Sequence, residues 1–280
     1  MTAEPPILEA KEYAAPSIFQ ARNLLREARR QKRLADAPVP AICLLDPDGD
    51  VARVLAEAGR GVRSDNWACY HTELVEFMHA GTRVGVIGRA VGGAFAVLVA
   101  EQLFATGCEL LVSVTSAGRL APAEPGPAFM LIERALRDEG TSYHYLPPAR
   151  FVEADQPLAA AIEDALGAAP LPVVRGGSWS TDAPFRETAA AIARARELGL
   201  LAVEMEAASL YAFAAACRCP VICFAHLTNE LAQVAGDFEK GEDEGLSEVL
   251  GILAACASAW AKIGGTGRAR AGEPGSAEED

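Results

Sequence analysis

The chain has 280 residues, 51% of them hydrophobic, and a formal net charge of −13. Such a chain can bury a sizeable core as one domain, and its negative charge argues against nucleic acid as a partner, because that binding relies on positive charge that neutralises phosphates. Seven cysteines without CxxC spacing suggest neither a metal site nor a disulfide framework, so we expect reduced thiols in a cytoplasmic protein. The sequence has no signal-peptide pattern and no apolar run near the ~20 residues of a spanning helix, so we expect no membrane partner.

The first predicted element is an N-terminal helix. Residues 17–34 have an amphipathic pattern with a strongly basic face, and two prolines within residues 36–40 end it. We therefore assign residues 1–36 to an N-terminal helical extension. At the other end, residues 265–280 are rich in glycine and charge, which predicts a disordered tail.

Strand and helix signals alternate between these two segments. Short apolar runs predict strands near residues 41–45, 83–87, 110–115, 172–174, 201–203 and 221–224. Apolar residues at helical spacing predict helices near residues 51–58, 92–105, 128–138, 156–167, 185–198, 205–217 and 245–262. This alternation is typical of an α/β domain, residues 37–264, in which helices cover both faces of a sheet.

Residues 200–213 carry the strongest functional signal, because a predicted strand ends in two acids around a methionine and continues into a predicted helix. Open α/β sheets bind ligands at the carboxyl ends of their strands. In extended backbone Glu204 and Glu206 share one side and Met205 takes the other, which suits a sugar with polar and apolar surfaces. The alternative is a helix whose first turn carries acids that suit its dipole.

Four segments resemble the nucleoside phosphorylase family, which includes uridine phosphorylase and the methylthioadenosine nucleosidases. They are RDEGTSYHYLP at residues 137–147, VTSAGRLAP at 114–122, GSWSTDAPFRET at 177–188 and VEMEAA at 203–208. Their order and spacing agree with the family over about residues 42–229. The first is most similar to the uridine phosphorylases, and the second is more similar to the nucleosidases. The resemblance implies a single three-layer α/β domain with a central twisted mixed sheet flanked by helices.

The resemblance also implies how the sugar is bound. Glu206 matches the glutamate that binds the ribose hydroxyls and serves catalysis, Met205 matches the methionine that packs on the sugar, and Glu204 is a supporting neighbour. Glycosidic cleavage passes through an oxocarbenium-like state, so negative charge near the anomeric carbon assists it.

Two loops resemble the family's phosphate site. Gly49 and Arg53 lie in DPDGDVAR, and Ser116 and Gly118 lie in VTSAG. Forked guanidinium and backbone donors suit a tetrahedral anion, so Arg53 is also a candidate catalytic residue. A turn with a solvated Arg53 is the alternative.

The match to the phosphate site has departures. Ser113 and Asp65 stand where uridine phosphorylases have arginines, and Arg89, in the glycine-rich turn GRAVGG, is a candidate replacement. The turn does not fit GxGxxG, so no dinucleotide is indicated. The resemblance thus implies inorganic phosphate as co-substrate and no cofactor, while the departures leave water open as the nucleophile.

Base recognition is predicted from the same resemblance. Asp182, Phe185 and Arg186 occupy the base-contacting region, although Arg186 could instead pair on the helix that follows. His144 is a further candidate, with a structural role as its alternative. Asn229 stands where purine-cleaving relatives have an aspartate that protonates the base, and because an amide cannot protonate it, we expect a pyrimidine or 6-oxopurine base.

The sequence therefore predicts a nucleoside phosphorylase that yields a pentose 1-phosphate and a free base. A nucleoside hydrolase and a non-catalytic nucleoside-binding protein are the alternatives. Family members borrow site residues across a subunit interface, so the resemblance implies a homo-oligomer, either a dimer or a hexamer.

Overall fold

A computed structural model describes residues 5–120, 129–169, 171–231, 238, 240 and 242–264. The tail predicted at residues 265–280 lies outside the described residues. The α-helices are α1 (Ala21–Lys32), α2 (Asp50–Glu57), α3 (Gly93–Ala105), α4 (Gln156–Gly167), α5 (Ala189–Glu197), α6 (Ala207–Cys217) and α7 (Leu246–Lys262). Short 3-10 helices are η1 (Pro6–Leu8), η2 (Thr141–His144), η3 (Pro184–Arg186) and η4 (Glu242–Gly245). No helix in the described ranges is long and apolar enough to cross a bilayer.

One mixed β-sheet forms the centre of the domain. Its strands are β1 (Ile42–Asp46), β2 (Val62–Arg63), β3 (Val75–His79), β4 (Thr82–Gly88), β5 (Leu110–Arg119), β6 (Phe129–Asp138), β7 (Phe151–Glu153), β8 (Val173–Thr181), β9 (Leu200–Glu204) and β10 (Val221–Asn229). The order is β10-β6-β8-β9-β5-β1-β4-β3-β2, and β7 pairs with β6. Because β10 also pairs with β5, the strands β5, β10, β6, β8 and β9 close into a ring, and β1 to β4 extend from it as an open sheet.

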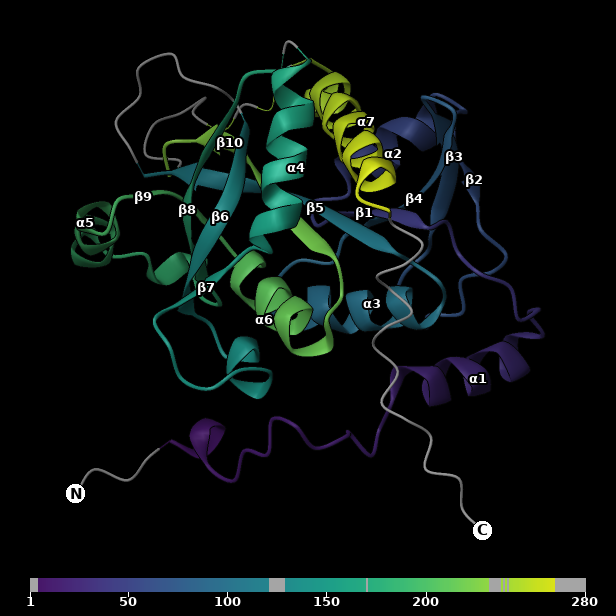
Figure 1. Ribbon diagram of the computed structural model, residues 1–280, viewed down its shortest axis with the longest axis horizontal. Coiled ribbons are helices and arrows are strands. Elements are labelled where there is room, and N and C mark those ends of the chain that lie inside the picture. Colours follow the sequence, from purple (N-terminus) through teal and green to yellow (C-terminus); the bar gives the residue numbers. More distant parts are fainter. Residues whose placement is uncertain are drawn as a thin grey trace.

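Helices cover both faces of this sheet (Figure 1), with α2, α4 and α7 on one side and α3 and α6 on the other. The strands facing them are apolar and buried, as in β1, where all five residues are buried. This confirms the predicted three-layer α/β class with a mixed sheet.

One predicted element is wrong. Residues 128–138 were expected to form a helix, but β6 occupies Phe129–Asp138. The register of β6 against β8 shifts between Ile132 and Arg134, so a bulge at Glu133 interrupts the alternation of a strand. Its charged residues then fall at a spacing that resembles a helix. The strands β2, β3 and β7 were not predicted.

The N-terminal helix predicted at residues 17–34 forms over α1. Leu25 and Ala28 on its apolar face are buried against Ala68, and the helix lies beside α3 (Figure 1). Its charges are partly neutralised nearby, since Arg30 pairs with Glu27 at 2.8 Å and Arg29 pairs with Asp36 at 3.4 Å.

Candidate active site

Glu204 lies at the junction between β9 and α6, and both oxygens of its carboxylate accept hydrogen bonds. Glu204 Oε2 accepts hydrogen bonds from the backbone N–H groups of Glu206 and Ala207, both at 2.7 Å. Its Oε1 accepts the Ser178 hydroxyl at 3.0 Å and the Ser180 hydroxyl. Glu204 shapes the start of α6, because it accepts two backbone N–H groups that the first helical turn leaves free, while the two hydroxyls join it to β8.

Glu206 lies at the N-cap of α6 and is 2% exposed. Its Oε1 accepts the Gly92 N–H at 2.6 Å, and its Oε2 accepts the Thr115 hydroxyl at 2.8 Å and the Met205 N–H at 3.3 Å. A carboxylate offers about four lone-pair positions, so Glu206 retains acceptor capacity for a further donor such as a sugar hydroxyl.

The two glutamates affect each other's protonation. Burial raises the pKa of both, and the negative charge of Glu204 helps to raise the pKa of Glu206 to about 8. Hydrogen bonds donated to Glu206 favour its ionised form. A ligand that donates to this carboxylate therefore binds more tightly when the carboxylate is charged.

The loop between β1 and α2 is held by a third buried acid. Asp46 accepts the backbone N–H groups of Gly49 and Ala52, both at 3.1 Å, and burial raises its pKa to about 6. Gly49 has φ +85°, and a Cβ there would lie 2.7 Å from Arg89 Cγ. The position therefore needs glycine, and it places Arg89 against the loop.

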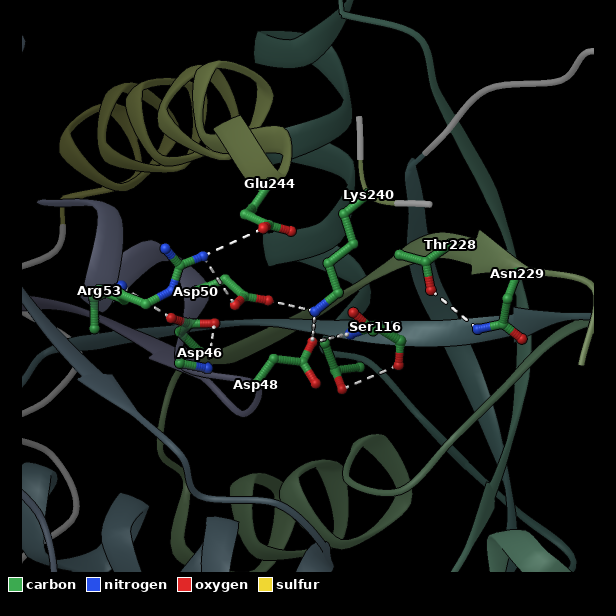
Figure 2. Close-up of polar contacts among 12 residues, drawn as sticks. Asp46, Asp48, Asp50, Arg53, Ser116, Thr228, Asn229, Lys240 and Glu244 are labelled. Carbon is green, nitrogen blue, oxygen red and sulfur yellow. Dashed lines mark hydrogen bonds and ion pairs between the residues drawn. The ribbon is translucent and has the colours of Figure 1, made fainter. Parts of the chain in front are cut away.

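The predicted phosphate loop is filled by an aspartate of the protein. Asp48 Oδ2 accepts the Ser116 N–H at 3.1 Å and lies 3.2 Å from Lys240 Nζ (Figure 2). The same ammonium pairs with Asp50, which lowers the pKa of that carboxyl despite its burial. The backbone donor that was expected to bind phosphate thus already binds a carboxylate.

Arg53, the other predicted phosphate ligand, is also paired internally. Its guanidinium lies 3.2 Å from Glu57, 3.2 Å from Glu244 and 3.5 Å from Asp50. Figure 2 shows it directed toward Asp50 and Glu244. An incoming anion would have to displace these carboxylates.

A crevice of about 20 Å³ lies among these groups. A cavity needs roughly 10–15 Å³ of such volume to hold a water molecule, so the crevice has room for about one. It is lined mostly by polar residues, among them Asp46, Asp48, Asp50, Thr115, Ser116, His226, Lys240 and Glu244. Because Thr115 also donates to Glu206, the crevice adjoins the predicted sugar site.

His226 is neutral in this crevice at physiological pH. Burial and the nearby Lys240 charge lower its pKa to about 4. Its ring stacks on Phe129 with the centroids 4.2 Å apart. The histidine thus contributes shape and no positive charge for an anion.

Asn229 lies at the end of β10, opposite Gly118 of β5. Its Oδ1 accepts the Leu231 N–H at 2.8 Å, and its Nδ2 donates to the Thr228 hydroxyl at 3.1 Å. These bonds orient the amide at the same end of the sheet as Glu206. One N–H of the amide stays available for a base carbonyl.

The remaining predicted base contacts lie at the surface of this chain. Phe185 is 98% exposed on η3, next to the exposed Arg186. Asp182 accepts the Gly140 N–H at 2.8 Å, and His144 Nδ1 lies 2.8 Å from Lys11 Nζ. The fold therefore gathers the predicted sugar and anion residues but leaves these side chains facing solvent or the N-terminal segment.

A family model described as the Phosphorylase superfamily matches residues 41–262. The chain belongs to this superfamily. The family resemblance read from the sequence is therefore confirmed. A comparison with curated proteins finds no match.

Solved structures of this superfamily share the fold. AMP nucleosidase from Bacteroides thetaiotaomicron VPI-5482 is similar with a TM-score of 0.65 and 20% identity, covering 86% of this chain and 98% of that one. Uridine phosphorylase from Vibrio fischeri ES114 has a TM-score of 0.62 and 16% identity, and the match covers 83% of this chain and 93% of that one. Purine nucleoside phosphorylase from Toxoplasma gondii has a TM-score of 0.66 and 14% identity, and the match covers 81% of this chain and 93% of that one. Phosphorylases and nucleosidases thus both adopt this fold, so the fold alone does not select between phosphate and water.

Sequence reasoning missed several residues that organise the site. Thr115 and Gly92 both donate to Glu206, and Lys240 links two aspartates. Thr115 lies in VTSAG directly before Ser116, so the sequence could have indicated it as a site residue. Lys240 lies in a stretch without a strand or helix pattern, and its partners are 190 or more residues away in the chain.

Proposed function

We propose that this protein cleaves the N-glycosidic bond of nucleosides with water, giving a free base and a free pentose. The observation that carries the proposal is the bond between Asp48 Oδ2 and the Ser116 N–H, because it puts a carboxylate where phosphate was expected. A dianion would be repelled by Asp46, Asp48 and Asp50, whereas a water molecule fits the adjoining crevice.

In this proposal the residues divide the work. Glu206 accepts the sugar hydroxyls and supplies negative charge to the oxocarbenium-like transition state. Asp48 removes a proton from the water molecule while the water oxygen bonds to the anomeric carbon. The glycosidic bond breaks, its electron pair leaves with the base nitrogen, and the base then takes a proton from solvent. Asp48 returns its own proton to solvent.

The proposed substrate carries a uracil or a 6-oxopurine base. The Asn229 amide can donate to a base carbonyl but cannot protonate a ring nitrogen. A base that leaves as a stabilised anion needs this hydrogen bond more than it needs an acid. Adenosine should therefore be cleaved more slowly than uridine or inosine.

Phosphorolysis is the second candidate, and Arg89 favours it. Its stem lies against Gly49, and its guanidinium forms no ion pair within the part of the chain that the structure describes. This arginine could supply the charge that Ser113 and Asp65 do not. Phosphate would then have to displace Asp48 from Ser116.

A nucleoside panel assayed with and without phosphate tests the proposal. We expect base release that is independent of phosphate, with free ribose as product. Asp48→Asn should lower kcat roughly a hundredfold or more, because general-base catalysis contributes on that order. Asp164→Asn, at an exposed position on α4, is the matched control and should leave the rate unchanged. Saturation with phosphate and formation of a pentose 1-phosphate would establish the second candidate, and no base release from any nucleoside would favour a binding protein.

We also propose that the active form is a homo-oligomer. Val91 and Leu98 on the α3 side of the domain are 51% and 40% exposed, and Phe185 is almost fully exposed. Apolar side chains in such positions commonly lie in protein interfaces. Light scattering should then give a mass of at least two chains, and a monomer with full activity would contradict the proposal.

A further inference from the structure

A second cavity, of about 470 Å³, shares no lining residue with the crevice beside Asp48. It is bounded by the end of β7, the start of α4, the C-terminal half of α6 and the last turns of α7. Leu158, Tyr211 and Trp260 form its floor, since they are between 1% and 5% exposed. The apolar floor can therefore receive an apolar group of a ligand.

Three charged side chains line the cavity around this floor, and one of them, Asp155, also accepts the Leu158 N–H at 3.0 Å as the N-cap of α4. Glu153, Asp155 and Arg218 all line the cavity and are exposed. Among the described residues, no ion pair within 4.0 Å joins Arg218 to either acid. The acids come from β7 and the N-cap of α4, whereas Arg218 comes from the C-cap of α6. Side chains of both charges therefore line the same cavity.

We propose that this cavity binds a zwitterionic α-amino acid with an apolar side chain. The guanidinium of Arg218 suits the carboxylate, because such bidentate pairs combine charge with geometry. The ligand's ammonium suits Glu153 and Asp155, and its side chain packs on the floor. A simple anion would meet two carboxylates and a simple cation would meet Arg218, so a ligand that carries both charges suits the cavity best.

The cavity and the active site lie at opposite ends of two shared elements, α6 and β10. Helix α6 has Glu206 at its N-cap and Arg218 at its C-cap. Strand β10 begins directly after Cys219 and Pro220, which line the cavity, and ends at Asn229. Two of the elements that carry active-site residues therefore have their other ends at this cavity.

Calorimetric titration of the full chain with L-phenylalanine tests the proposal. We expect one molecule bound per chain, with affinity roughly tenfold or more weaker for phenethylamine, which lacks the carboxylate, and for hydrocinnamate, which lacks the ammonium. Equal binding of all three, or no binding of L-phenylalanine at millimolar concentration, would overturn the proposal.

Variants locate the bound molecule. Arg218→Gly should weaken binding roughly tenfold or more and should fold normally, since residue 218 has φ +55°, which glycine adopts easily. Glu153→Gln should also weaken binding, whereas Arg60→Ala, a change of an exposed arginine elsewhere, should not. Glu206→Gln should leave this affinity unchanged, because the cavity is separate from the active site. Binding lost in Glu206→Gln, or kept in both Arg218→Gly and Glu153→Gln, would overturn the proposal.

Discussion

Two groups of acids in this molecule are held in different ways. Glu204 and Glu206, after β9, are surrounded by backbone N–H groups and hydroxyls, all of them neutral donors. Asp48 and Asp50, after β1, are held by the ammonium of Lys240. The first group keeps raised pKa values, whereas the pKa of Asp50 is lowered.

This difference shows how one site can separate two tasks. Neutral donors position a carboxylate without fixing its charge, so the ligand can influence the charge of Glu206. Lys240 instead outweighs the effect of burial and lowers the pKa of Asp50, which favours the charged form of that carboxyl.

The largest expected effect is on folding. Glu204→Ala would leave buried backbone N–H groups without acceptors, and each such group costs about 1–3 kcal/mol. We expect a loss of roughly 3 kcal/mol or more in the free energy of unfolding, measured by urea denaturation. Glu57→Ala, a change of an exposed acid on α2, should cost under about 1 kcal/mol. A similar small loss for Glu204→Ala would mean that its four bonds are not formed in solution.

The next effect is on catalysis. Glu206→Gln keeps the shape of the side chain but removes the charge that the proposed mechanism assigns to Glu206. We expect kcat/KM to fall about tenfold to a hundredfold, with little change in the free energy of unfolding measured at about pH 5, where the folded wild-type side chain keeps its proton. Steady-state rates beside a urea titration give both quantities. Activity within about a factor of two of the unmodified protein would remove Glu206 from the site.

The contrast also predicts a pH dependence of stability. The pKa of Glu206 is raised from 4.5 to about 8, so the folded state binds its proton more tightly than the unfolded state. The stability that this proton contributes is complete below the unfolded pKa and is lost as the pH rises through the folded pKa. Urea midpoints should therefore fall between about pH 5 and about pH 8, and Glu206→Gln should flatten this slope. An unchanged slope in the variant would assign the effect to other groups.

The smallest expected effect concerns the lysine. Lys240→Met removes the two ion pairs with Asp48 and Asp50, in which the lysine side chain is 13% exposed, and we expect a loss of about 1 kcal/mol at low salt. Because salt screens such pairs, the loss should shrink in molar sodium chloride. The loss from Glu204→Ala should stay constant in the same titration, since neutral donors are not screened. Equal salt dependence in the two variants would contradict the distinction.

The sequence predicted the fold better than the anion site, because helices and strands follow from patterns among neighbouring residues whereas the anion site does not. Strands β1 and β9 and helix α4 follow simple periodicity, so their residues were found. Strand β6 was missed because the bulge at Glu133 breaks its alternation. The anion loop resembled its relatives in sequence, but its occupant depends on Lys240 and Asp48, which only the folded chain brings together. Hydrophobic periodicity predicts helices and strands, but it does not predict which residues far apart in the sequence, such as Asp48 and Lys240, form a pair.

The closed ring of strands has a consequence for the order in which the protein can form. Strand β10 is the last to be synthesised, and it joins β5 to β6. Until residues 221–229 have left the ribosome, β5 and β6 each lack a neighbour, and open strand edges favour pairing with other chains. The same strand brings Asn229 to Gly118, so one late step both covers these strand edges and places the proposed base-binding amide.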